Sequence, residues 1–179
     1  MKKNNRITAL LMAIIMIFSS SSVLMQVYAE DKVEKVYTAA GAHLDTSWIW
    51  DIGTTISRFL RNTLTGGEES QTRSHVGNFY LMDKYPDYKF NFEGAYRYEL
   101  IKEYYPEEWE KLKKYIANGQ WNTAGSLYEN GDVITVSPEA LIRNILYGNQ
   151  FFADTFGNES RNNDIYLPDC FGYGYVLPS

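Results

Sequence analysis

Short apolar segments alternate along the chain with longer stretches in which apolar residues recur every three or four positions. The short segments are rich in aromatic and β-branched residues, and residues 88–92, Tyr-Lys-Phe-Asn-Phe, alternate cleanly between apolar and polar. The longer stretches have the spacing of amphipathic helices. Strands are therefore predicted at residues 36–40, 88–92, 121–126 and 165–167.

The predicted helices carry start and stop signals. Pro106 is placed to begin a helix that runs to Asn118 and stops at Gly119. Ser137 followed by Pro138 supplies an N-cap and a first-turn proline for another helix. Helices are also predicted over residues 52–64, around residues 79–82 and from Ala95.

Two stretches allow more specific expectations. Residues 65–72 are rich in Gly, Glu and Ser, so an exposed loop is predicted there. Four strand-and-helix units in succession predict an α/β fold with a mostly parallel sheet, in which ligands bind at the carboxyl ends of the strands. The helix that begins at Ser137 is predicted to have an apolar face made of Leu141, Ile142, Ile145, Leu146 and Phe152.

The first 29 residues resemble an export signal. Three basic residues precede an apolar run at residues 7–18, and Val27-Tyr28-Ala29 resembles a small-residue cleavage site. Cleavage after Ala29 would yield a secreted or cell-surface protein. The alternative is an uncleaved membrane anchor, although the apolar run is short for a membrane span.

Composition narrows the classes of partner. Loss of the signal would remove three basic residues and lower the formal net charge from −5 to −8, which argues against a nucleic-acid partner. The chain has 15 tyrosines, and aromatic rings beside carboxylates form sugar-binding surfaces as well as cores. With Cys170 as its single cysteine, an exported chain has no internal disulfide.

The sequence ends at Leu177-Pro178-Ser179, a few residues after a predicted strand, where the alternation calls for a helix. A sheet that stopped there would keep an unpaired edge. We therefore expect residues 30–179 to be the N-terminal part of a larger, truncated domain.

His43 and Asp45 form the first candidate site, directly after a predicted strand. On extended backbone, side chains two residues apart point to the same face, so the pair can hold one divalent cation such as zinc. A histidine hydrogen-bonded to a helix-capping aspartate is the alternative. Trp48 follows closely and favours the first interpretation, because an aromatic face beside a metal suits a sugar ring.

Asp169 is the second candidate, because it follows the last predicted strand. Pro-Asp followed by Gly is also ordinary turn chemistry. Its neighbour Cys170 is interpreted as a small buried apolar residue rather than a nucleophile. His75 receives a surface interpretation. Glu129 and Asp132 follow the third predicted strand and are therefore eligible for the site by position, but a solvated loop is the preferred interpretation for both.

Four segments together resemble glycoside hydrolase family 38, the retaining α-mannosidases. The segments, in order, are HLDTSW, PDYKFNFEGAYRYELIKEYYPEEWEKLKKYIANGQW, SPEALIRNILYGNQFF and LPDCFGYGYVLPS. The resemblance covers nearly the whole chain from Val36. Two departures are Gly174, where many members have Ser, and residues 65–78, which look like an added or altered loop.

The resemblance implies the N-terminal portion of an irregular (β/α) barrel, incomplete in this chain. It also implies one Zn²⁺ ion held by His43, Asp45 and Asp169, with Asp169 as the nucleophile. Trp48 and Phe171 would bind the mannose ring. The family's fourth ligand and its acid/base residue would lie further on, so this part is expected to be inactive alone.

The resemblance implies a mannose-containing oligosaccharide or glycan as substrate. No nucleic acid is expected as a partner, and a membrane only if the signal is uncleaved. Two other functions stay open at this point. One is a non-catalytic sugar-binding remnant, and the other is a different metal-dependent carbohydrate hydrolase such as a polysaccharide deacetylase.

Overall fold

A computed structural model describes residues 38–70, 73–174 and 177, without the side chains of residues 68–75. The predicted signal at residues 1–29 lies outside this part. All described residues after Thr38 belong to one compact unit, Ala39–Ser179. Among the described residues, no helix combines the length and apolar character needed to cross a membrane.

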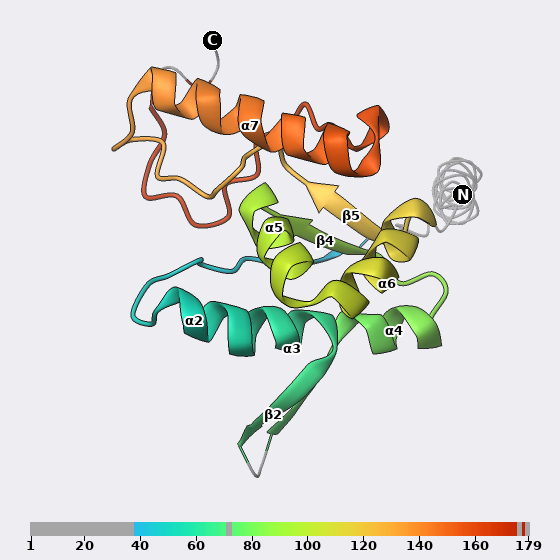
Figure 1. Ribbon diagram of the computed structural model, residues 1–179. Coiled ribbons are helices and arrows are strands. Elements are labelled where there is room, and N and C mark those ends of the chain that lie inside the picture. The colour runs from blue at the N-terminus through green and yellow to red at the C-terminus, as the bar shows by residue number, and fades with distance from the viewer. Residues whose placement is uncertain (1–37, 71–72, 175–176, 178–179) are drawn as a thin grey trace, which may run out of the picture. The chain divides into compact units, whose positions relative to one another are not determined.

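A parallel three-stranded sheet forms the centre of this unit (Figure 1). Its strands lie in the order β1 (Ala40–Ala42), β4 (Phe90–Glu93) and β5 (Trp121–Ala124). Gly41 pairs with Asn91, which in turn pairs with Asn122. The predicted α/β class with a parallel sheet is confirmed, and each of the three strands overlaps or adjoins its predicted range.

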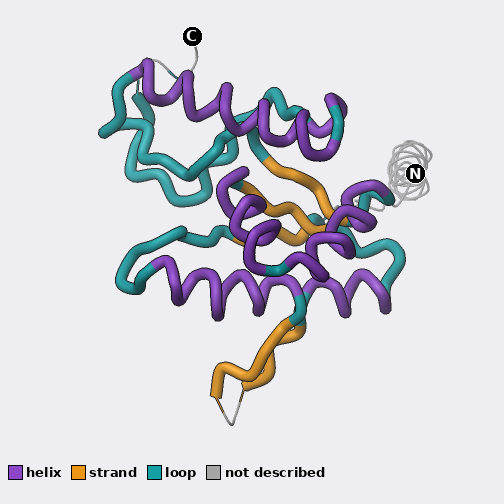
Figure 2. The backbone as a smooth tube through the Cα atoms, viewed as in Figure 1, coloured by secondary structure: helices purple, strands orange, loops and turns teal. Residues whose placement is uncertain are grey.

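The fourth predicted strand, at residues 165–167, is wrong. The stretch is loop (Figure 2), and Ile165 and Leu167 pack against a small second apolar cluster formed by Leu127, Val133 and Leu141. The apolar character that suggested a strand therefore comes from side-chain packing without strand pairing.

Helices follow the strands as the alternation predicted. The predicted starts hold: α6 begins at Pro106, and Ser137 caps α7 by accepting a hydrogen bond from the Ala140 N–H at 3.2 Å. The bounds are α2 Ile52–Thr54, the π-helical η1 Thr55–Leu60, α3 Arg61–Leu64, α4 Asn78–Lys84, α5 Ala95–Tyr104, α6 Pro106–Ala117, α7 Pro138–Phe156 and the 3₁₀ turn η2 Asn158–Ser160.

The predicted loop at residues 65–72 is instead mostly part of a hairpin. Strands β2 (Gly66–Ser70) and β3 (Arg73–Val76) pair antiparallel and extend away from the helices (Figure 1). The Gly, Glu and Ser content suggested a loop, but backbone hydrogen bonds alone can pair a segment that lacks β-branched residues. His75 lies in β3, but its side chain is outside the described part, so the prediction that it is exposed stays a prediction.

The main core packs aromatic side chains from the sheet against α5 and α7. The ring of Tyr98 lies 5.8 Å from that of Phe92 and 5.3 Å from that of Phe152. Of the apolar face predicted on α7, Leu141 and Phe152 are buried, but Ile142 and Leu146 are 50% and 56% exposed. The prediction of that face was therefore wrong for these two residues.

Replacing Tyr98 by phenylalanine is expected to lower the free energy of unfolding by about 1–3 kcal/mol. The buried Tyr98 hydroxyl donates to the Phe92 carbonyl at 2.7 Å and accepts from Trp121 Nε1 at 2.9 Å. Burial raises the pKa of Tyr98, which keeps this donor neutral. Chemical denaturation measures the change. Tyr104→Phe, at a half-exposed position of the same helix, is the control and should change stability by less than about 0.5 kcal/mol.

Candidate metal centre

His43, Asp45 and Asp169 converge at the carboxyl end of the parallel sheet. His43 follows the last residue of β1, and Asp169 lies on the loop after η2. Leu44, between His43 and Asp45, turns into the main core. The backbone therefore alternates, and the His43 and Asp45 side chains share the opposite face, as their spacing predicted.

The three side chains are close enough to bind one ion. His43 Nε2 lies 3.3 Å from Asp45 Oδ1 and 3.8 Å from Asp169 Oδ2. One ligand atom from each residue lies within 4.8 Å of the others. Among the described residues, the buried His43 Nε2 has no hydrogen-bond partner. A buried nitrogen facing two carboxylates without a hydrogen bond fits a cation bound between them.

The other ring nitrogen of His43 is held from behind. His43 Nδ1 lies 2.8 Å from Glu93 Oε1, at the end of β4. Asn130 Nδ2 donates to the same carboxylate oxygen at 2.7 Å. The ring of His43 is thus fixed by groups outside the candidate ligand set.

A pocket of about 260 Å³ lies over the three candidate ligands. Its volume is close to the lower limit for small-molecule sites, about 300 Å³, which suits a single sugar ring. Trp48 and Phe171 line it and are 71% and 84% exposed, so both rings are free to contact a ligand. Asp132 also lines this pocket, while its carboxylate accepts from the Ile134 N–H at 3.0 Å.

The turn formed by residues 43–48 is anchored by a fully buried arginine. Arg97 Nε donates to the Leu44 carbonyl at 2.5 Å, and Arg97 Nη2 lies 3.0 Å from Glu129 Oε1. The hydroxyl of Thr46 donates to Glu129 Oε2 at 2.5 Å. The solvated-loop interpretation of Glu129 is therefore wrong, because its carboxylate joins this turn to α5.

A second contact to the same turn comes from the π-helical segment. Thr55, which is fully buried, donates from its hydroxyl to the Thr46 carbonyl at 2.8 Å. The same hydroxyl accepts from Trp50 Nε1 at 2.8 Å. The backbone on both sides of Asp45 is thereby tied to buried groups, which limits how far the candidate ligands can move.

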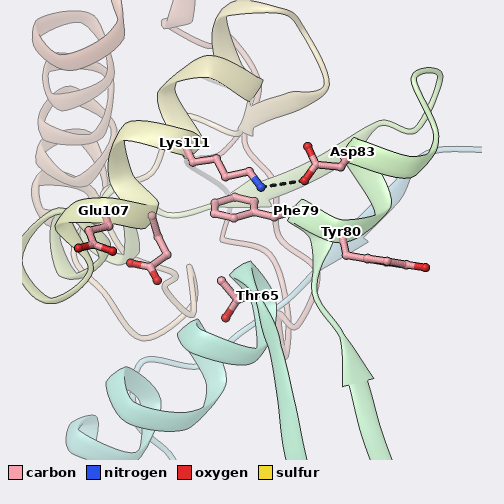
Figure 3. Close-up of a pocket in the computed structure, with 7 residues that line it drawn as sticks. Thr65, Phe79, Tyr80, Asp83, Glu107 and Lys111 are labelled. Carbon is pink, nitrogen blue, oxygen red and sulfur yellow. Dashed lines mark hydrogen bonds and ion pairs between the residues drawn. The ribbon is translucent and has the colours of Figure 1, made fainter.

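Cys170 and a distant hollow do not contribute to the site. The Cys170 thiol donates to the Gly172 carbonyl at 2.6 Å and packs on the second apolar cluster. A hollow of about 390 Å³ is lined by Thr65, Phe79 and Glu107 among others, and Figure 3 shows these residues. Its Lys111 ammonium is already paired with Asp83 at 2.8 Å, so the hollow lacks a free cationic group.

Arg97, Glu93 and Asn130 were missed from the sequence. Each makes contacts to residues between 32 and 87 positions away, and no local pattern reports such pairing. The one available signal was position, because Glu93 and Asn130 both come at or just after a predicted strand.

Comparisons with known proteins give one family model and several relatives that match most of this chain. A family model described as "Glycosyl hydrolases family 38 N-terminal domain" matches residues 34–179. Alpha-mannosidase G of Dictyostelium discoideum is 33% identical over 144 residues, and Alpha-mannosidase 2C1 of Homo sapiens is 27% identical over 143, each match covering 80% of this chain and 12% of the relative. Alpha-mannosidase of Saccharomyces cerevisiae is 29% identical over 162 residues, covering 90% of this chain and 14% of the relative.

The match covers only a small share of these relatives, because the chain spans 12–14% of their length. Among solved structures, a 4-alpha-glucanotransferase from Thermococcus litoralis matches 50% of this chain and 14% of its own, with a TM-score of 0.43 and 18% identity. This likeness is too low for an argument about fold or function.

Proposed function

Because the chain belongs to glycosyl hydrolase family 38, as the resemblance predicted, we propose that it forms the N-terminal part of the catalytic domain of a zinc-dependent retaining α-mannosidase. The substrate class is the α-mannosidic bonds of oligosaccharides or glycans. The observation that supports this best is the convergence of His43, Asp45 and Asp169 in one pocket beside two exposed aromatic rings.

Zinc suits the three candidate ligands. One imidazole nitrogen and two carboxylate oxygens form a donor set that catalytic zinc accepts. In the part of the chain that the structure describes, the buried His43 Nε2 has no hydrogen-bond partner, which supports this assignment. When bound, the ion supplies Lewis-acid polarisation of sugar oxygens. A remaining ligand and the acid/base carboxyl group are assigned to other parts of the enzyme.

Asp169 is the proposed nucleophile. Its carboxylate, which is half-exposed at the pocket, attacks the anomeric carbon while the bond to the leaving oxygen breaks. The leaving oxygen takes a proton from a separate carboxylic acid about 5 Å away. Water then cleaves the resulting ester and releases mannose with retained configuration. Trp48 and Phe171 contact the sugar ring through their exposed faces.

The test uses the full-length protein and an aryl α-mannoside. We expect hydrolysis that a chelator abolishes and added zinc restores, with no hydrolysis of the matching aryl β-mannoside. A full-length wild type that binds no metal and leaves the α-mannoside intact would contradict the proposal. Release of acetate from an acetylated glycan would support a deacetylase instead, and mannoside binding without turnover would support a sugar-binding remnant.

Export belongs to the same proposal. The predicted signal at residues 1–29 would direct the protein to the cell surface or the medium. Its support is the order of basic residues, apolar run and small-residue site in the sequence.

A further inference from the structure

Glu93 is a buried carboxylate to which the proposed reaction gives no role. It is only 2% exposed at the end of β4, and burying a carboxylate is costly unless its charge is compensated. Building on the proposed function, we infer that Glu93 is a positioning residue for the metal: it orients His43 so that the bare Nε2 faces Asp45 and Asp169.

The geometry of one contact carries the first step. Glu93 Oε1 lies 2.8 Å from His43 Nδ1, so the Glu93 carboxylate holds the imidazole by the nitrogen that does not face Asp45 and Asp169. A partner on one ring nitrogen orients the ring, and the nitrogen left for the metal is Nε2. That atom is the one that lies 3.3 Å from Asp45 Oδ1 and is buried without a partner among the described residues.

Asn130 adds the second step. Its Nδ2 donates to Glu93 Oε1 at 2.7 Å and lies 3.1 Å from His43 Nδ1. Two nitrogen atoms therefore lie within hydrogen-bond distance of one carboxylate oxygen, which fixes the Glu93 side chain. The backbone N–H of Asn130 donates to Glu129 Oε1 at 2.8 Å, so the loop that presents Asn130 is itself held.

Glu93 acts through His43 rather than on a substrate. The pocket over the ligands is lined by His43, Asn130 and Asp169 among others, but Glu93 does not line it. Glu93 lies in β4, the middle strand of the sheet, and pairs in register with Ala124 of the edge strand β5. This pairing holds the backbone at Glu93 in place. A carboxylate behind a ligating histidine raises the basicity of that ligand and fixes its orientation.

Zinc affinity of the full-length protein, measured by competition with a chromophoric chelator, tests the inference. Glu93→Gln is expected to weaken binding by about 10- to 100-fold. The matched control is Glu99→Gln on α5. It replaces a carboxylate that accepts a hydrogen bond from the Tyr128 hydroxyl, removes an equal charge and should leave zinc affinity unchanged. The absorption bands of the cobalt-substituted protein should shift for Glu93→Gln alone.

The outcomes separate this inference from the proposed function. If the wild type binds no zinc, the proposed function fails. If the wild type binds zinc and Glu93→Gln matches it in affinity and cobalt spectrum, the positioning role is overturned while the zinc site stands. Should Glu93→Gln fail to fold, Asn130→Ala decides, because loss of one donor to Oε1 should weaken zinc binding several-fold, and unchanged affinity would overturn the role.

Discussion

Replacing Asp169 by alanine is expected to lower kcat for an aryl α-mannoside by on the order of 10⁴- to 10⁶-fold, the range seen when an enzyme loses its nucleophile. The physical reason is that the variant lacks the carboxylate proposed to form the ester with the anomeric carbon. Steady-state kinetics on the full-length protein measure the loss. Unfolding should change little, because the Asp169 side chain is 55% exposed.

Asp169 has two proposed roles, and azide separates them. In a retaining enzyme without its nucleophile, azide can attack the anomeric carbon of an α-mannoside and yield the β-mannosyl azide. Rescue of Asp169→Ala with this product would support the nucleophile. Loss of zinc without rescue would reduce Asp169 to a ligand, and wild-type kcat in Asp169→Ala would contradict both roles.

Replacing Arg97 by methionine is expected to lower the free energy of unfolding by about 3 kcal/mol, the lower end of the range for a buried ion pair, because the Glu129 side chain is 33% exposed. Arg97 is fully buried, and its loss would remove the cation beside Glu129 and the side-chain donor to the Leu44 carbonyl. Chemical denaturation measures the change. The free energy of unfolding of Arg97→Lys should lie between those of the wild type and Arg97→Met, because an ammonium keeps the charge but lacks the several N–H donors of the guanidinium.

Arg143→Met supplies the matched control. Arg143 lies on α7 and pairs with Glu139 one turn away at 2.7 Å, with both side chains more than half exposed. Exposed pairs of this kind contribute about 0.3–0.5 kcal/mol. Equal losses in the two methionine variants would show that burial of Arg97 adds nothing to its contribution.

Helix boundaries could be predicted because their signals are local. Pro106 and Ser137 begin helices for reasons that involve only the next few residues, a missing N–H in one case and an N-cap hydroxyl in the other. Residues 165–167 and the hairpin strands could not be predicted in this way. Whether a segment pairs as a strand depends on its partner, and the partner's position is set by the tertiary fold.

The same distinction between local signals and tertiary contacts decides which parts of the candidate site could be predicted. The spacing of His43 and Asp45 correctly indicated a shared face, and the position of Asp169 after an apolar segment correctly suggested that it lies near them, although that segment is not a strand. Glu93 could not be found, because a polar residue at the end of a strand has no local feature that marks it as buried. Ile142 and Leu146 show the converse: helical spacing predicts which side chains share a face and does not decide what covers it.

The anchoring of the turn at residues 43–48 bears on protein design. Its contacts come from α5, from the loop after β5 and from the π-helical segment. A graft of the six-residue motif onto another strand-and-loop scaffold would move the candidate ligands without the groups that hold their backbone. We therefore regard the transferable unit as the turn together with Arg97, Glu129 and Thr55, which makes the site a property of the assembled domain.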